Sequence, residues 1–238
     1  MTTLDGVVSF NMAGRSGGVS VSGANEGDRF IMGLLRASAD AVVVGAATVG
    51  AVSRGGLWTA EFIYPPAKEL YTRYRAGLPR KPEHPLIVVV TARGSLDLNR
   101  AIFRTPGIRV AIITTDRGRE KLVAAGSEQL ASTRVHALDA ADDRIEPGAI
   151  LEVLTREYQV RHLLHEGGPT LFGGFLASGF IDELFLTLAP QIAGRVNERP
   201  RPGLVEGTAF TPATAPWLSL ATAKQAGSHL YLRYRKQT

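Results

Sequence analysis

The sequence predicts an α/β protein built around a largely parallel β-sheet. Apolar runs of strand length alternate with segments of helical period along the 238 residues. Several runs, such as Leu86–Val90, are continuously apolar, which is typical of strands covered on both faces. A chain of this length buries roughly 70–75% of its unfolded surface on folding, so it can form a sizeable core.

Strands are predicted along the whole chain. The last two are separated only by a loop, so they are expected to form an antiparallel hairpin. In the final segment, leucine and tyrosine positions alternate with His229, Tyr231 and Arg233, as in a half-buried strand. The predicted strands are Val7–Asn11, Asp40–Gly45, Leu86–Thr91, Arg109–Thr115, Val135–Leu138, His162–Glu166, Glu183–Ala189, Leu218–Ala223 and His229–Arg235.

Helix signals lie between these strands. Asn25 is a favourable N-cap with Asp28 three residues later, and the segment that follows places Phe30, Leu34 and Leu35 on one side. Further helices are expected after Pro65 as far as Gly77, after Asp116, after Pro147, and from Pro169 to Gly179.

Composition limits the domain organisation and the class of protein. With 45% apolar and 21% charged residues, the chain is neither disordered nor a coiled coil. It has no cysteine, which excludes disulfides, thiolate metal sites and a cysteine nucleophile. The segment Asn197–Pro216 is rich in Pro, Gly and Thr but lies between strands, so it is expected to be a long loop. Residues 1–238 are therefore expected to form a single domain.

The charge and hydropathy of the chain indicate which binding partners the protein can have. The formal net charge is +5, but no five-residue run of Lys and Arg occurs, which argues against a nucleic-acid partner. A mildly basic chain also suits small phosphorylated ligands, and charge alone does not decide between these partners. The longest apolar stretch, Ala41–Val52, is too short to span a membrane, and no charged leader opens the chain. A cytoplasmic protein is expected. His162 and His165 are three apart on a strand, a spacing that does not predict a metal site.

The strongest local signal is the segment Leu163–Leu171. A strand ends at Glu166, Gly167 and Gly168 make a tight turn, and a helix begins at Pro169. Backbone N–H groups at a helix N-terminus bind phosphate well when no side chain stands in the way. The spacing is neither that of a dinucleotide fingerprint nor that of a P-loop, so a plain strand-to-helix turn is equally compatible with it.

Two further segments have polar groups where strands or helices end. The strand Val42–Gly45 leads to Thr48, whose hydroxyl can bond a phosphate at a strand end, although the small residues between them also allow close helix packing. Arg36 closes the helix that begins at Asn25, a position that the helix dipole favours in any case. The Gly- and Ser-rich stretch Gly14–Gly23 is either a lid or a mobile loop.

Together, these segments and their order resemble the reductase domain of riboflavin biosynthesis, which has the dihydrofolate-reductase-like fold. The resemblance covers nearly the whole chain, and its motifs are specific as a set. It implies a central, mostly parallel sheet with an antiparallel C-terminal hairpin and helices on both faces. The matching segments are Thr3–Gly6, Leu34–Ala37, Ala39–Val49, Val89–Thr91, Glu166–Leu171, Asp182–Leu184 and Ala189–Pro190.

The resemblance also implies an activity. The hydride donor would be NADPH, and the substrate a ribosylamine phosphate of the 5-amino-6-(5-phosphoribosylamino)uracil or 2,5-diaminopyrimidinone type. Its sugar would be reduced to a ribityl chain through the open imine form. No cysteine- or His-x-Glu-type deaminase signature occurs, so only the reduction is expected. The family analogy, with the amphipathic C-terminal hairpin, predicts a homodimer.

The roles of the family's site residues are transferred to the positions of this chain that match its motifs, and no catalytic residue is assigned. Ser20, Arg36 and Glu166 would face the substrate, and the Arg36 guanidinium fork suits a phosphate. Arg36 and Glu166 are expected to lie together, with a purely structural ion pair as the alternative. Arg93, by charge and position, is expected to hold the 2′-phosphate of NADPH. The other predicted cofactor contacts are Gly45, Thr48, Gly167, Gly168, Pro169, Thr170, Leu171, Gly173 and Gly174.

The chain departs from the family pattern at several places. Where the family has an acidic pair and proline after its Thr-Val, the chain has Gly50–Arg54, and a second substrate-side arginine has no match. The Trp58-bearing segment Gly55–Gly77 is expected to reshape the substrate pocket. Only Met1–Thr3 precede the Leu-Asp-Gly motif, which indicates a short first strand or a late-assigned start. Because of these departures, two alternative functions stay open. The chain could be a dihydrofolate- or pterin-type reductase, or a nucleotide-binding module without turnover.

Overall fold

Two β-sheets, one parallel and one antiparallel, organise the protein, here a computed structural model that describes residues 1–12, 17–79, 81–140 and 144–237. Backbone contacts divide the chain into two units. We call residues 29–168 the parallel-sheet unit, and residues 1–28 with 169–238 the hairpin unit. The elements are α1 (Gly18–Ser22), α2 (Glu26–Ser38), β1 (Ala41–Gly45), α3 (Ala46–Ala51), α4 (Ala60–Ile63), η1 (Pro65–Ala67), α5 (Lys68–Ala76), β2 (Leu86–Val90), α6 (Ala101–Arg104), β3 (Val110–Thr115), α7 (Asp116–Ala124), η2 (Ser127–Gln129), β4 (Thr133–Leu138), α8 (Pro147–Tyr158), β5 (Leu163–His165), α9 (Pro169–Ala177), β6 (Glu183–Leu188), β7 (Leu218–Ala226) and β8 (His229–Lys236).

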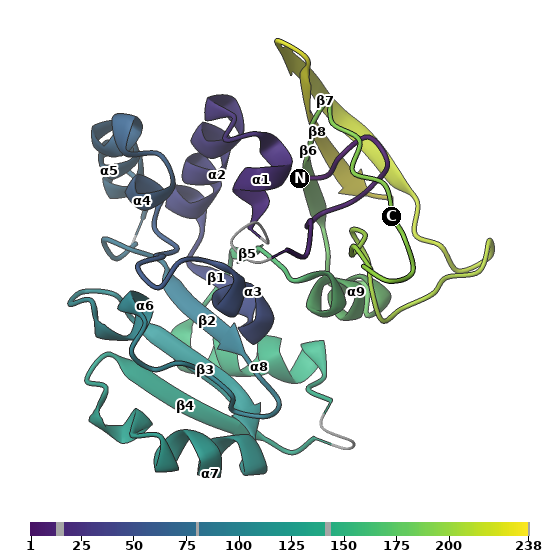
Figure 1. Ribbon diagram of the computed structural model, residues 1–238. Coiled ribbons are helices and arrows are strands. Elements are labelled where there is room, and N and C mark those ends of the chain that lie inside the picture. The colour runs from purple at the N-terminus through teal and green to yellow at the C-terminus, as the bar shows by residue number, and fades with distance from the viewer. Residues whose placement is uncertain (13–16, 80, 141–143, 238) are drawn as a thin grey trace. The chain divides into compact units, whose positions relative to one another are not determined.

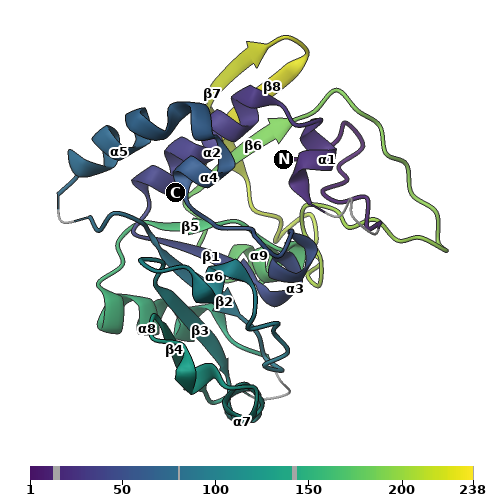
Figure 2. The same cartoon turned by 60° about the vertical axis from the view of Figure 1, so that its left-hand side comes forward.

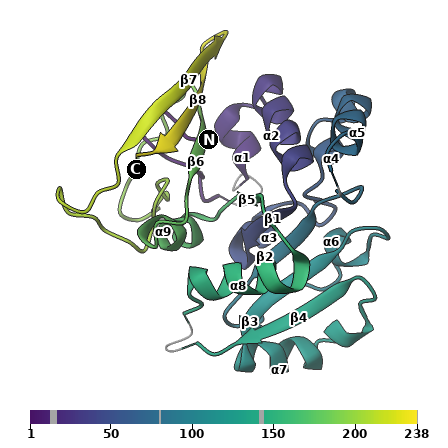
Figure 3. The ribbon, with the colours of Figure 1, turned by 180° about the vertical axis from the view of Figure 1, so that it is seen from behind.

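The parallel-sheet unit contains five strands in the order β4-β3-β2-β1-β5, all parallel. Its central strands are buried along nearly their whole length, as their continuous apolar sequences predicted. Helix α8 covers one face of the sheet, while α3 and α6 lie on the other (Figures 1 and 3). The α/β fold with a largely parallel sheet is therefore confirmed.

One face of this sheet carries the main hydrophobic core. Alternate residues of the central strands pack there against side chains from α3, α6 and α7. Trp58, only 4% exposed, belongs to this core, and Tyr71 is buried against α2, where its hydroxyl donates to the Phe30 carbonyl at 2.9 Å. Both side chains therefore serve packing, and the expectation that the segment Gly55–Gly77 reshapes the substrate pocket stays a prediction.

Local signals at the helix ends explain where the helices begin. Asn25 caps α2, since its Oδ1 accepts from the backbone N–H of Asp28 at 2.9 Å. Thr115 caps α7 in the same way, accepting from the N–H of Gly118 at 3.1 Å. Helices α8 and α9 begin at prolines, as predicted. The short helices α1, α3, α4 and α6 were not predicted, since four to six residues carry too little periodicity.

At the amino end of β1, Asp40 and Arg75 tie neighbouring elements together. Asp40 pairs with Lys81 through one carboxylate oxygen and accepts the backbone N–H groups of Arg161 and His162 through the other. Arg75, 5% exposed, donates to the carbonyls of Ala37 and Ala39 just where α2 ends. These contacts fix the end of α2 relative to the parallel sheet.

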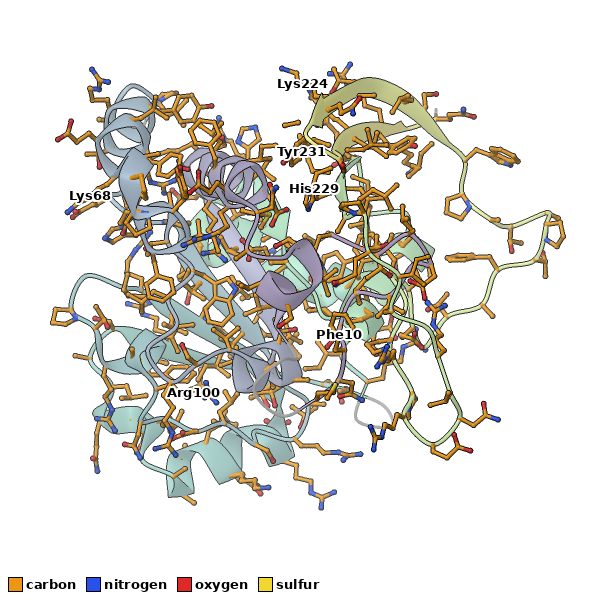
Figure 4. All side chains as sticks on the ribbon, turned by 45° about the horizontal axis from the view of Figure 1, so that its top comes forward. Phe10, Lys68, Arg100, Lys224, His229 and Tyr231 are labelled. Atoms are coloured by element: carbon orange, nitrogen blue, oxygen red, sulfur yellow. The ribbon has the colours of Figure 1, made fainter. Side chains whose placement is uncertain are left out.

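The hairpin unit contains the antiparallel sheet β6-β8-β7, with β8 in the centre and a bulge in β7 between Leu220 and Thr222. The β7–β8 hairpin, drawn in yellow in Figures 1 and 2, confirms the predicted antiparallel C-terminal pair. Figure 4 labels Tyr231 and His229, which lie on the same side of β8. Tyr231 donates to Asn25 Oδ1 at 2.6 Å, and His229 Nδ1 lies 3.2 Å from Asn25 Nδ2.

The predicted strand Val7–Asn11 is wrong. This segment is irregular, because a turn closed by the Thr3 N–H and the Val7 carbonyl at 3.0 Å, with Gly6 at φ +77°, precedes it. Instead, Thr2 forms a parallel bridge with Leu188 of β6. The other predicted strands coincide with β1 to β8. Part of the Gly14–Gly23 stretch lies outside the described residues. Among those described, no helix has the length and apolarity needed to cross a membrane.

Candidate functional site at the carboxyl edge of the parallel sheet

The carboxyl ends of β1 and β5 lie side by side in the parallel sheet. Val43 is in register with His165, the Glu166 N–H donates to the Val43 carbonyl at 3.0 Å, and the Gly45 N–H donates to the Gly167 carbonyl at 2.8 Å. Open parallel sheets bind their ligands at this edge. The fold therefore brings together two predicted segments that lie far apart in the sequence, the end of the strand at Gly45 and the turn at Gly167 and Gly168.

Glycines keep this edge free of side chains. A Cβ on Gly168 would lie 3.1 Å from Thr48 Oγ1, and one on Gly45 would lie 3.6 Å from the Gly168 nitrogen. Gly167 has a φ of +95°, which L side chains rarely adopt, and the Gly167–Gly168 peptide is cis. The Gly168 backbone and the Thr48 hydroxyl thus border a cradle that a methyl group on Gly168 would crowd. This chemistry fits the phosphate groups of a nucleotide cofactor.

Next to this cradle, Arg36 and Glu166 form a bidentate ion pair. Nε–Oε1 and Nη2–Oε2 are both 2.7 Å long, and the two side chains are 7% and 8% exposed. Arg36 Nη1 also donates to the carbonyls of Thr59 at 3.2 Å and Leu57 at 3.4 Å. The two residues lie together as predicted, but the guanidinium fork is occupied by Glu166 rather than open to a phosphate.

Arg93 lies at the same edge of the sheet, three residues beyond the end of β2, and its side chain is exposed. It lines a hollow of about 620 Å³ together with Arg117, Glu120 and Lys121 of α7. These three α7 residues were not among the predicted site residues. Their position directly after β3 was the available signal, because parallel strands end at the same edge.

The remaining predicted contacts belong to the hairpin unit. Ser20 lies in α1, half-buried, and its carbonyl accepts from Gln191 Nε2 at 3.4 Å. Pro169 to Gly174 form the first turns of α9. Gly173 has a packing role there, since a Cβ would lie 2.6 Å from the Glu206 carbonyl oxygen. No group of three His, Asp or Glu side chains suited to hold a metal ion occurs within the described ranges.

Comparison with known proteins points to one family. Residues 1–230 match the family described as the RibD C-terminal domain. A protein of Archaeoglobus fulgidus named 2,5-diamino-6-ribosylamino-4(3H)-pyrimidinone 5′-phosphate reductase is 28% identical over 185 residues, which are 78% of this chain and 76% of that protein.

Solved structures show the same fold. Acinetobacter baumannii RibD superposes with a TM-score of 0.68 at 22% identity, over 100% of this chain and 56% of that one. The chain thus spans about half the length of that protein. A pyrimidine reductase-like protein of Corynebacterium diphtheriae also gives a TM-score of 0.68, at 21% identity, over 100% of this chain and 89% of that one. Since the family match covers nearly every residue of both units, the chain belongs to the RibD C-terminal domain family.

Proposed function

We propose that the chain is the NADPH-dependent reductase of a ribosylaminopyrimidine phosphate in riboflavin biosynthesis, acting as one catalytic domain without deaminase activity. The observation that carries this proposal is the side-chain-free cradle at Gly45 and Gly168, which adjoins the buried Arg36–Glu166 pair. A nucleotide site and a polar site thereby adjoin each other at one sheet edge. The name of the Archaeoglobus relative specifies the same type of substrate.

The glycine cradle would hold the cofactor. The Gly168 backbone amide and the Thr48 hydroxyl would bind the pyrophosphate, beside Gly167, whose own N–H donates to His165 Nδ1 at 3.1 Å. The chain then continues directly into α9, from Pro169 to Gly174. Arg93 would pair with the 2′-phosphate, which favours NADPH over NADH. When bound, NADPH supplies the hydride that reduces the imine carbon of the opened sugar. At the cradle, the chain's own contribution would be to fix the position of the cofactor.

Glu166 would position the substrate. The bidentate pair with Arg36 holds the carboxylate in one orientation, while its remaining lone pairs can accept from hydroxyl or N–H groups of the ribosylamine. Arg36 therefore acts mainly by orienting Glu166, and direct phosphate binding by Arg36 requires the pair to open. Such positioning can lower a barrier by several kcal/mol.

We also propose that the protein is a homodimer. One face of the β6-β8-β7 sheet is mostly apolar, with Gln225 and Lys236 as its polar members, and its side chains are exposed or only half-buried, with Leu220 at 54% exposure. A largely apolar face of this kind is typical of a subunit interface. Its large apolar members are Leu184, Leu186, Leu188, Leu218, Leu220, Leu230, Leu232 and Tyr234.

The test is turnover of the purified chain with NADPH, followed through the near-ultraviolet absorbance of the reduced nicotinamide. The diaminopyrimidinone and aminouracil ribosylamine phosphates are compared with dihydrofolate. Oxidation of NADPH with either pyrimidine supports the proposal, and turnover only with dihydrofolate identifies a pterin-type reductase. Cofactor binding without turnover on any substrate identifies a nucleotide-binding module instead.

A further inference from the structure

Two arginines are brought together by the close contact of two glycines. Gly94, at φ +62°, follows Arg93 in the loop after β2, and Gly118 follows Arg117 in the first turn of α7. A Cβ on Gly94 would overlap the Gly118 carbonyl, and one on Gly118 would lie 2.7 Å from the Ala92 carbonyl oxygen. Because the two backbones touch, the preceding arginines are held as neighbours at the carboxyl edge of the sheet.

The hollow that they line has an excess of positive charge. Arg93, Arg117 and Lys121 face a single carboxylate, Glu120, around a volume of about 620 Å³. Lys121 Nζ is 3.0 Å from Ser95 Oγ, which ties α7 to the loop after β2. Within the described part of the chain, none of the three cations forms an ion pair.

The neighbouring cation Arg119 shows that such a pair is available on this helix. It lies 3.5 Å from Asp116, one turn away. Three cations that line one hollow and form no ion pair repel one another, and a dianionic ligand would relieve that repulsion. A phosphate monoester has the required charge and accepts hydrogen bonds from guanidinium groups on several sides.

We propose that Arg117 and Lys121 of α7 determine cofactor specificity by binding, together with Arg93, the phosphate monoester on the adenosine ribose of NADPH. This inference rests on the proposed function, which supplies the cofactor, and adds the α7 residues to it. Glu120 has the opposite effect. Its carboxylate repels the phosphate, and it can accept hydrogen bonds from the unphosphorylated ribose of NADH. The balance between these four residues then sets the ratio of the two affinities.

The experiment measures dissociation constants of NADP⁺ and NAD⁺ for the full chain by titration calorimetry. We expect Arg117→Ala and Lys121→Ala each to weaken NADP⁺ binding about 3- to 30-fold, as for loss of a partly screened charge-assisted hydrogen bond, with little change for NAD⁺. Glu120→Gln is expected to shift the ratio the other way, in favour of NADP⁺. Arg119→Ala removes a paired cation from the same helix and serves as the matched control.

Further readouts separate the inference from the proposed function. The salt dependence of NADP⁺ binding should become shallower in Arg117→Ala and Lys121→Ala, since fewer cations meet the phosphate. All four substituted side chains are exposed, so the melting temperature should change little. If NADP⁺ binds the parent chain but Arg117→Ala and Lys121→Ala behave like Arg119→Ala, the inference is overturned while the proposed function stands.

If neither dinucleotide binds the parent chain, the proposed function fails, and smaller probes decide the inference. Adenosine 2′,5′-bisphosphate is then compared with adenosine 5′-monophosphate in the same variants. Tighter binding of the bisphosphate that disappears in Arg117→Ala and Lys121→Ala supports the phosphate site. Equal binding of both probes overturns it.

Discussion

Arg36 and Glu166 lie 130 residues apart in the chain and form a buried, bidentate ion pair with two 2.7 Å contacts. Arg36 lies in the last turn of α2, and Glu166 directly follows β5, at the edge where the glycine cradle lies. The pair therefore joins a helix end to the candidate site. Whether it serves only the fold or also the reaction can be decided by mutation.

We expect Arg36→Ala and Glu166→Ala each to lower the free energy of unfolding by about 3–5 kcal/mol, because each leaves an uncompensated buried charge. The double variant Arg36→Met with Glu166→Leu should recover much of that loss while single-turnover reduction stays impaired. Denaturant unfolding and rapid-mixing kinetics measure the two effects. Unchanged turnover in the double variant would show that the pair is only structural.

Gly168→Val is expected to abolish NADPH binding while the chain still folds. Its side chain would extend into the cradle beside Thr48, where even a Cβ lies 3.1 Å from the hydroxyl oxygen. Cofactor titration with circular dichroism checks both parts of this expectation. Adding Thr48→Ala relieves the local crowding, so recovery of binding in that double variant would contradict the assignment of the cradle to the cofactor.

Asp40 is expected to make stability depend on acid pH. Burial raises the pKa of this carboxyl, but hydrogen bonds from Lys81 and from the amides of His162 and Arg161 outweigh burial and lower the pKa to about 2. A lowered folded-state pKa contributes stability above the ordinary value of 3.8, which is lost as the pH falls from about 4 to about 2.

Asp40→Asn should therefore be less stable than the parent near neutral pH, by about 1 kcal/mol after allowance for solvent screening. The difference should shrink below pH 4. Urea unfolding as a function of pH measures it, and a difference that stays constant down to about pH 2 would refute the role of the ionised carboxylate.

Arg75→Met should destabilise the fold by about 2–4 kcal/mol, because carbonyls at the end of α2 lose their buried donors. The matched control is Arg73→Ala, an exposed residue of the same helix, which should change stability by less than about 0.5 kcal/mol. Chemical denaturation compares the two. Equal effects would mean that the carbonyl contacts of Arg75 contribute little.

Light scattering at micromolar concentration should give the mass of a dimer for the parent chain. Leu220→Glu places a charge on the apolar face of β7 and should yield monomers. Thr222→Glu introduces the same charge on the opposite face of that strand, opposite Arg233, and should stay dimeric. A monomeric parent chain would rule out the dimer, and monomers from both variants would place the interface elsewhere.

Parts of the fold with continuous local signals were predictable. The runs that became β1, β2 and β3 contain little but apolar residues, and Asn25 and the prolines of α8 and α9 mark helix starts through their own chemistry. Val7–Asn11 was misassigned because its short apolar stretch has no strand partner once the Thr3–Val7 turn has formed. Strand pairing depends on remote residues, which a local pattern does not contain.

The sequence by itself determined eight of the nine predicted strands, the longer helices, the glycine turn at Gly167 and the presence of arginines at element ends. Only the tertiary structure decided that Glu166 occupies the Arg36 fork, that Trp58 packs in the core, and that Arg117 lies beside Arg93. The physical reason is that capping and hydrophobic periodicity act within a few residues of the chain. Ion pairs and shared hollows instead depend on which strands become neighbours, and parallel pairing brings together residues far apart in sequence.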